Sequence, residues 1–265
     1  YFYNIICLMV TKALTAADIG INSCKIEEEV VVTNSLPGMS IVGLPDNAVS
    51  EARERVHSAI KNSGYTFPTG KVIVNLAPGD NRKEGIIYYL PIAVGIFKEQ
   101  GIDIPDDNNT AFLGELSLDG NLRKVNGILP LVSGLKENGI TTVFVPEENA
   151  REAALVKDMV ILGVKHLADI AGHYTENPIK PTVIDINEYL ARNANTDFSY
   201  DFKDVKGQVK AKKALEIAAA GGHNILMSGS PGSGKTLMAK CLASILPPLE
   251  LKEALELTKI YSISG

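Results

Sequence analysis

The sequence predicts an α/β protein made of two domains, and three observations support this prediction. Segments with the alternating pattern of strands take turns with segments of helical periodicity between residues 25 and 162. The pattern breaks off between residues 174 and 200, which contain prolines and several asparagines but little sustained periodicity. A glycine-rich loop begins at Gly229, between a strand-like and a helix-like segment. We therefore expect a first domain over residues 9–173, a linker over 174–200 and a second domain over 201–265.

In the first domain, strand-like and helix-like segments are separated by turn residues. Strands are expected over residues 25–33, 41–42, 71–76, 111–118, 141–145 and 159–162. Helices are expected over residues 46–62, 90–99, 129–138 and 147–156. The first of these helices has Asp46 as its N-cap, ends before Gly64 and carries its apolar side chains on one face.

The second domain is expected to begin with a helix over residues 208–220 and a strand over residues 224–228. The strand leads into the glycine-rich loop, and a helix follows over about residues 235–246. Pro247 and Pro248 then stop this helix. Within the linker we expect at most one short helix, over residues 186–191.

Composition and charge limit the class of protein. Hydrophobic residues make up 45% of the 265 residues and charged residues 22%, the balance of a globular protein. The net charge of −5 argues against a passive DNA coat protein, although a motor can contact DNA through a few residues. The cysteines Cys7, Cys24 and Cys241 lie far apart, and the four histidines lack a metal-binding spacing. We expect no disulfide framework and no zinc site, and a reducing cytoplasm fits.

The chain begins with a short apolar run rather than with a methionine. This run is too short to span a membrane. We expect Met9 to be the natural start and residues 1–8 to lie outside the native protein. The alternative is an ordinary first strand.

The glycine-rich loop matches the phosphate-binding pattern GxxxxGK[ST] at every fixed position. Its residues are Gly229, Ser230, Pro231, Gly232, Ser233, Gly234, Lys235 and Thr236. Glycines let the backbone N–H groups turn toward an anion, and the helix that follows adds its positive N-terminal end. Lys235, the candidate catalytic residue, is expected to reach the β- and γ-phosphates of ATP, and the Thr236 hydroxyl to bind Mg²⁺.

A motor also needs an acidic residue for Mg²⁺ and a catalytic glutamate on later strands. Only 30 residues follow Lys235 (265 − 235), which is too few for the strand that carries them. We therefore expect the chain to end inside its ATPase domain, to bind nucleotide poorly and to hydrolyse little of it.

Several motifs resemble one family of ATPases. The segment Asp204-Val205-Lys206-Gly207-Gln208 resembles the leading segment of AAA+ modules, and residues 219–226 resemble the magnesium-chelatase branch of these proteins. Gly43-Leu44-Pro45, Asn75-Leu76-Ala77-Pro78 and Lys83-Glu84-Gly85 are similar to the bacterial competence-associated, magnesium-chelatase-like ATPases. The resemblance covers nearly the whole chain from Met9 onward.

The resemblance implies an α+β first domain with the fold of the Lon proteolytic domain, followed by the start of an AAA+ core. It implies binding of ATP and Mg²⁺, with the backbone of Val205 and Gly207 against the adenine. It also implies a cytoplasmic homo-hexamer, with no membrane partner, that acts on single-stranded or branched DNA. The implied activity is ATP-driven branch migration of recombination intermediates during natural transformation.

The Lon-like fold raises the question of peptidase activity, because Lon proteases use a serine and a lysine. The resemblance places Ile87 at the serine position and Leu131 at the lysine position. Neither side chain can act as a nucleophile or a base, so the first domain is expected to be a non-proteolytic scaffold. The chain departs from the family pattern at Ile86, Ile87 and Tyr89, just before Leu90.

Other charged residues have two interpretations each. The run Glu27-Glu28-Glu29 is interpreted as a solvated strand edge, with a metal site as the alternative. The pairs Arg82-Lys83 and Arg123-Lys124 either contact DNA phosphates or are solvated surface pairs.

The leading hypothesis is an ATP-driven DNA motor subunit. A magnesium-chelatase subunit that inserts Mg²⁺ into a porphyrin is the first alternative, and an ATP-dependent peptidase is a disfavoured second one. A gene product without activity is a further alternative. The long Lon-like first domain favours the DNA motor, because chelatase ATPase subunits begin close to their AAA+ module.

Overall fold

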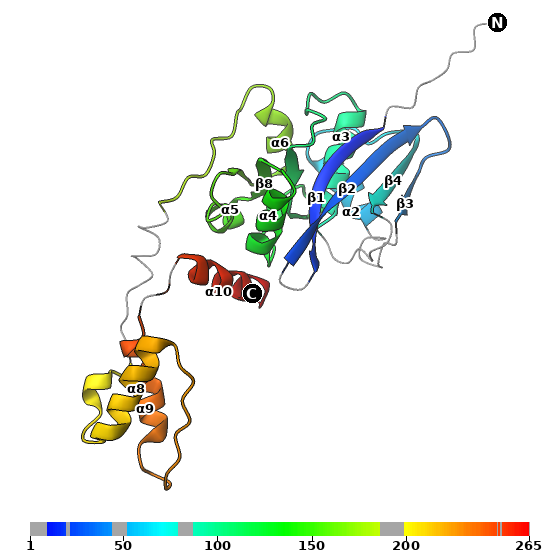
Figure 1. Ribbon diagram of the computed structural model, residues 1–265. Helices are drawn as coiled ribbons and strands as arrows, with labels where there is room; N and C mark the ends of the chain where they lie inside the picture. Colours follow the sequence, from blue (N-terminus) through cyan, green and yellow to red (C-terminus); the bar gives the residue numbers. More distant parts are fainter. Residues whose placement is uncertain are drawn as a thin grey trace, which may run out of the picture. The chain divides into compact units, whose positions relative to one another are not determined.

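The computed structural model describes residues 10–19, 22–43, 52–78, 87–185, 199–247, 249 and 251–264 (Figure 1). The chain divides into two compact units. The first comprises Tyr1–Ile184 together with Leu255–Gly265, and the second comprises Asp185–Ala254. The boundary near residue 185 falls inside the expected linker, whereas the last residues group with the first unit. The division into domains 9–173 and 201–265 stays a prediction.

The first unit is built on a seven-stranded sheet with the order β3-β4-β2-β1-β5-β8-β9. Its strands are β1 (Thr11–Ile19), β2 (Asn22–Thr33), β3 (Gly38–Val42), β4 (Lys71–Ala77), β5 (Thr110–Phe112), β8 (Thr142–Pro146) and β9 (Val160–Val164). Strand β2 runs antiparallel to both of its neighbours, β1 and β4, and all other neighbours are parallel. The short strands β6 (Glu115–Leu116) and β7 (Leu122–Arg123) form a separate antiparallel pair. The sequence thus makes a mixed α/β fold, as predicted.

Helices cover both faces of this sheet (Figure 1). Residues of α2 (Ala52–Asn62), α3 (Tyr89–Glu99) and α6 (Leu167–His173) belong to one buried cluster. Residues of α4 (Ile128–Glu137) and α5 (Glu147–Ala153) belong to the other. Alternate side chains of β1 point to opposite faces, so Ala13 joins the first cluster and Leu14 and Ala16 join the second.

Helix α3 is buried along almost its whole length, which explains its continuous apolar sequence. It packs closely on β2 at Gly95, where an added Cβ would overlap the side chain of Val30. The hydroxyl of Thr11 on β1 donates to the carbonyl oxygen of Gly95 at 3.0 Å. Position 95 therefore requires glycine, because α3 lies too close to β2 there for a larger side chain.

The structure confirms most of the expected elements and corrects others. The expected strand over residues 111–118 is broken after Phe112, because β6 leaves the large sheet to pair with β7. Strand β1, helix α6 and the terminal helix α10 (Leu251–Ser264) were not expected. Helix α2 is described only from Ala52 onward, and the expected helix over 186–191 and residues 1–9 lie outside the described residues. No described helix is long and apolar enough to cross a membrane.

The interpretation of Glu27-Glu28-Glu29 as a solvated strand edge is wrong, because β2 lies inside the sheet between β4 and β1. Glu28 shares a face with Ile26 and Val30 and is fully buried. On the other face, Glu27 pairs with Lys12 at 2.6 Å and Glu29 accepts a hydrogen bond from Asn75 at 2.8 Å. The metal-site alternative also fails within the described residues, which hold no group of three or more metal-ligating side chains.

Candidate nucleotide-binding site

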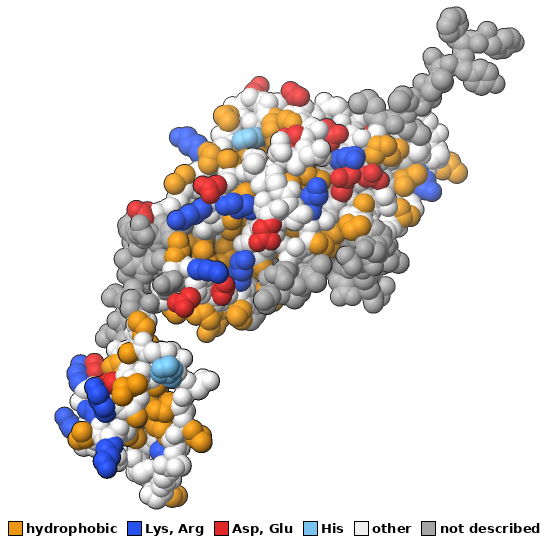
Figure 2. Space-filling view, viewed as in Figure 1, with side chains coloured by type: hydrophobic (Ala, Val, Ile, Leu, Met, Phe, Trp, Pro, Cys, Tyr) orange, Lys and Arg blue, Asp and Glu red, His pale blue; other side chains and the backbone are white. Residues whose placement is uncertain are grey.

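The second unit is a small helical body with its own core. Its elements are the 3-10 helix η1 (Phe202–Asp204), α8 (Val209–Gly221), α9 (Lys235–Cys241) and the 3-10 helix η2 (Leu242–Ile245). Phe202, Val205, Leu215, Met238 and Cys241 form the buried cluster that joins them. In Figure 2, Lys and Arg side chains gather on one side of this unit, whose exposed lysines include Lys206 and Lys210.

The expected strand over residues 224–228 does not form in the described chain, where residues 223–230 have irregular structure. Leu226, in the middle of this segment, is 95% exposed. A strand is defined by hydrogen bonds to a neighbour, and the described residues of the second unit include no strand that could pair with it. The apolar sequence of this segment therefore lacks the sheet that it would need.

The phosphate loop follows this segment directly and depends on its glycines. Gly232 has φ of +76° and Gly234 has φ of +85°, both in the left-handed region that side chains with a Cβ disfavour. Between them, the N–H of Ser233 donates to the carbonyl oxygen of Ser230 at 3.3 Å and closes a turn. Gly234 is the N-cap of α9, so the loop ends where the helix begins.

Lys235 is the first residue of α9, and its side chain folds back over the loop. Its ammonium donates to the carbonyl oxygens of Gly229 at 2.9 Å and Ser230 at 2.8 Å. The hydroxyl of Ser233 lies 3.3 Å from the same nitrogen. The cation is thus held on the side of the loop that faces a neighbouring cavity.

This cavity has a volume of about 390 Å³ and lies beside α8. Of the predicted site residues, it brings together Gly229, Ser230, Ser233 and Lys235. The other predicted site residues do not line it; they are Val205, Gly207, Pro231, Gly232, Gly234 and Thr236. Thr236 is exposed at the start of α9. The backbone oxygen of the buried Val205 accepts a hydrogen bond from Lys212 at 2.9 Å.

Gln208 is a site residue that the sequence did not single out by itself. Its side chain lines the cavity, and its Nε2 donates to the carbonyl oxygen of Ser233 in the phosphate loop at 3.4 Å. Its backbone has φ of +51°, an unusual value for a residue other than glycine. Its position at the end of Asp204-Val205-Lys206-Gly207-Gln208 was the only available signal.

The loop fits a nucleotide phosphate in its donor set. Within the described chain, the N–H groups of Gly232, Gly234 and Lys235 donate to no protein acceptor. Free backbone N–H groups next to a lysine ammonium match the needs of a phosphate anion. A hydroxyl oxygen such as that of Thr236 is a ligand that Mg²⁺ accepts beside phosphate oxygens.

The two residues that were expected at the Lon dyad positions pack in or against one apolar cluster. Leu131 is buried in the cluster under α4, and Ile87 packs against the same cluster. Of the two cationic pairs, Arg123 forms an ion pair with Glu115, with 3.9 Å between Nη1 and Oε1, and Lys124 is exposed. Arg82 and Lys83 lie outside the described residues.

Two family models match the chain. One, described as subunit ChlI of Mg-chelatase, matches residues 28–149, and the other, described as magnesium chelatase, subunit ChlI, matches residues 201–265. The chain belongs to the ChlI-like family of magnesium-chelatase ATPases. The second of these matches begins one residue before η1 and contains the whole phosphate loop.

Two relatives of the ComM and YifB type match most of the chain. The protein YifB of Salmonella typhimurium is 41% identical over 256 residues, which are 94% of this chain and 48% of that protein. The competence protein ComM of Haemophilus influenzae is 36% identical over 248 residues, or 93% of this chain and 48% of that protein. The chain therefore spans about half the length of the curated relatives it matches.

A further match confirms the likeness to Lon proteases in part of the chain. Lon protease 2 of Bacillus subtilis is 29% identical over 141 residues, which are 51% of this chain and 25% of that protein. This chain, a homologue of the magnesium-chelatase AAA+ ATPases, thus also has the expected similarity to Lon proteases.

Proposed function

We propose that the chain is the nucleotide-binding part of an ATP-driven motor subunit that acts on single-stranded or branched DNA. The observation that carries the proposal is the phosphate loop, in which Lys235 lines the cavity and the backbone N–H groups of the loop's end are free for an anion. The ComM likeness supports an activity in recombination during natural transformation, of the branch-migration or helicase type. A cytoplasmic homo-hexamer is part of this proposal.

In this proposal the loop from Gly229 to Thr236 binds the phosphates of ATP. Lys235 neutralises charge on the β- and γ-phosphates, and the Thr236 hydroxyl binds the Mg²⁺ that accompanies them. The backbone near Val205 and Gly207 lies against the adenine, and Gln208 holds the loop through Ser233. Bound Mg·ATP would supply the γ-phosphoryl group, whose transfer to water with release of ADP drives the motor.

The first unit is proposed to be a scaffold without peptidase activity. Peptide hydrolysis by a Ser–Lys pair requires a hydroxyl whose proton an amine can accept. Ile87 and Leu131 supply neither group, because both side chains are aliphatic. Purified chain is therefore expected to leave casein intact over hours, and cleavage that survives repurification would reverse this part of the proposal.

The test of the motor function is ATP hydrolysis by the whole gene product, with and without a branched DNA junction. We expect the junction to raise the rate and Lys235→Ala to abolish both rates. Lys240→Ala, on the same helix, serves as the matched control, because Lys240 lies 4.7 Å over the Tyr200 ring and not at the loop. An ATP hydrolysis rate that is the same with and without DNA would overturn the proposed action on DNA.

Magnesium insertion into a porphyrin is the second candidate, because both family models carry the chelatase description. The two functions differ in what stimulates ATP turnover. Stimulation by a porphyrin together with Mg²⁺, and not by DNA, would favour the chelatase function over the motor.

A further inference from the structure

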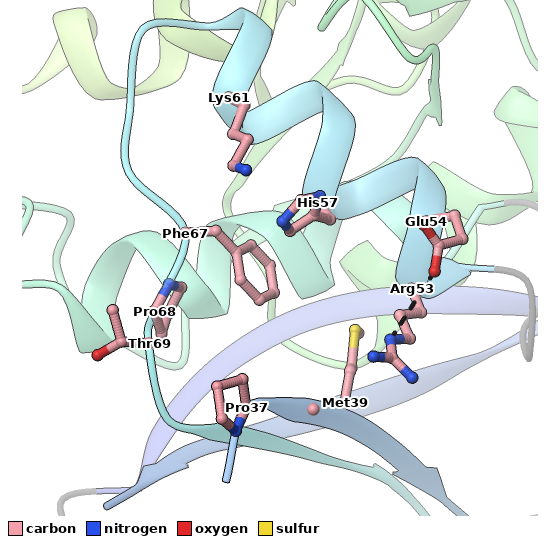
Figure 3. Close-up of a pocket in the computed structure, with 10 residues that line it drawn as sticks. Pro37, Met39, Arg53, Glu54, His57, Lys61, Phe67, Pro68 and Thr69 are labelled. Atoms are coloured by element: carbon pink, nitrogen blue, oxygen red, sulfur yellow. Dashed lines mark ion pairs between the residues drawn. The ribbon is translucent and has the colours of Figure 1, made fainter.

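A groove in the first unit lies far along the sequence from the phosphate loop (Figure 3). It has a volume of about 310 Å³ and lies between the edge strand β3, helix α2 and residues 67–69. Pro37 and Met39 line it from the strand side, and Phe67 and Pro68 line it from the chain that leads to β4. These side chains make its surface apolar on two sides.

Helix α2 gives the groove a row of nitrogen-bearing side chains. Arg53, His57 and Lys61 are four residues apart, so they lie on one face of the helix, and Figure 3 shows all three directed toward the groove. The rise of the helix sets successive members about 6 Å apart along its axis. Within the described part of the chain, Lys61 has no acidic partner, and the exposed Arg53 lies 3.9 Å from Glu54.

An aromatic pair lies beside the middle of this row. The rings of His57 and Phe67 meet edge to face, with centroids 4.7 Å apart and an interplanar angle of 64°. Both side chains are only partly buried, so each presents ring surface to the groove. Nucleobases stack on such rings whatever their identity, and a cationic row beside them follows the phosphate backbone.

We propose that this groove binds single-stranded nucleic acid, with phosphates on Arg53 and Lys61 and a base against His57 and Phe67. A duplex keeps its base faces stacked inside, so only an unpaired strand can offer both groups at once. The proposal deepens the proposed action on DNA by placing a strand-binding site on the first unit. An acidic peptide would use the same two cations but would gain nothing from the rings.

The test is fluorescence anisotropy with labelled dT20 and rU20, using the whole chain without nucleotide. The double variant Arg53→Ala/Lys61→Ala is expected to bind both more weakly. It should also lower the slope of log K against log salt by about 0.7 for each lost phosphate contact, or about 1.4 in total. The matched control is Lys157→Ala/Lys165→Ala, two exposed lysines that flank β9 at the opposite edge of the sheet. The ratio of the affinities for dT20 and rU20 shows whether the groove prefers DNA or RNA.

Two further variants separate a binding role from a structural one. Phe67→Leu keeps an apolar side chain but removes the ring face, and it should weaken binding at least about fivefold. Glu54→Gln removes the carboxylate next to Arg53 and should tighten binding, which a loss of folding cannot do. Circular dichroism and thermal unfolding verify that each variant is folded.

Unchanged affinity and salt slope in the double variant would overturn the proposal. So would displacement of dT20 by oligoglutamate together with full affinity in Phe67→Leu, because this outcome identifies an acidic peptide as the ligand. Failure of the motor function is distinguishable, since Lys235→Ala acts on ATP turnover and should leave dT20 binding intact.

Discussion

The ammonium of Lys235 donates a hydrogen bond of 2.9 Å to the carbonyl oxygen of Gly229, the first residue of the phosphate loop. A second bond, of 2.8 Å, goes to the carbonyl oxygen of Ser230. The loop thus holds its own lysine at the cavity through backbone oxygens. A nucleotide has to replace these neutral acceptors by phosphate oxygens, which form stronger, charge-assisted hydrogen bonds with the ammonium.

Removal of this ammonium should weaken nucleotide binding. Lys235→Ala is expected to lower the affinity for a fluorescent ATP analogue with Mg²⁺ at least about tenfold, since hydrogen bonds to a charged group contribute about 1.5–3 kcal/mol. Titration of the whole chain measures this affinity. Lys240→Ala should bind like the unmodified chain, and equal affinities for all three proteins would show that Lys235 does not contact the nucleotide.

The left-handed backbone at Gly234 should restrict this position to residues that tolerate positive φ. Gly234→Val is expected to cost about 1–2 kcal/mol in the free energy of unfolding of the second unit, because its Cβ opposes φ of +85°. Gly234→Asn should cost less, since asparagine visits this region more readily. Denaturant titration ranks the two variants, and the reverse order would contradict the strain argument.

Burial of Glu28 should make the first unit less stable as the pH rises. Both carboxylate oxygens are buried without a hydrogen-bond partner in the described chain, and burial raises the pKa of Glu28 well above its usual value. The folded state therefore keeps a proton that the unfolded state loses above about pH 4.3. The contribution of Glu28 to the free energy of unfolding should be fully present below that pH and be lost as the pH rises toward the raised pKa.

The variant Glu28→Gln isolates this effect because its side chain does not titrate. Its advantage in stability over the unmodified chain should therefore grow as the pH rises from about 4.3 toward 8. Glu29→Gln is the control, since Glu29 lies on the other face and accepts a hydrogen bond from Asn75. Parallel stability curves for Glu28→Gln and the unmodified chain would mean that Glu28 titrates normally.

The buried amide of Asn149 should stabilise the connection between β7 and α4. Its Oδ1 accepts from the N–H of Val125 and its Nδ2 donates to the carbonyl oxygen of Val125, both at 2.9 Å. Asn149→Ala leaves both backbone groups of Val125 without these partners. Each unsatisfied group should lower the free energy of unfolding by up to about 3 kcal/mol. Urea denaturation should show this loss, whereas the exposed Asn177→Ala should change stability by less than about 0.5 kcal/mol.

The elements that local patterns predicted well are those whose burial follows from their own sequence. The wholly apolar helix α3 and the alternating strand β4 are examples. Strand β1 escaped prediction because its small side chains, such as Ala13 and Ala16, become core residues only under helices distant in sequence. The strand expected over residues 224–228 failed for the converse reason, since its apolar residues require a neighbouring strand.

The sequence by itself determined the phosphate loop, because the residues that bind a phosphate are consecutive and need only the local backbone. It also determined the family, since the motifs lie in order along the chain. Only the tertiary structure decided that Glu28 is buried and that Arg53, His57 and Lys61 face Phe67 across a groove. Burial and contacts between distant residues depend on which strands and helices become neighbours. The residue pattern of a single strand does not specify its position in the sheet.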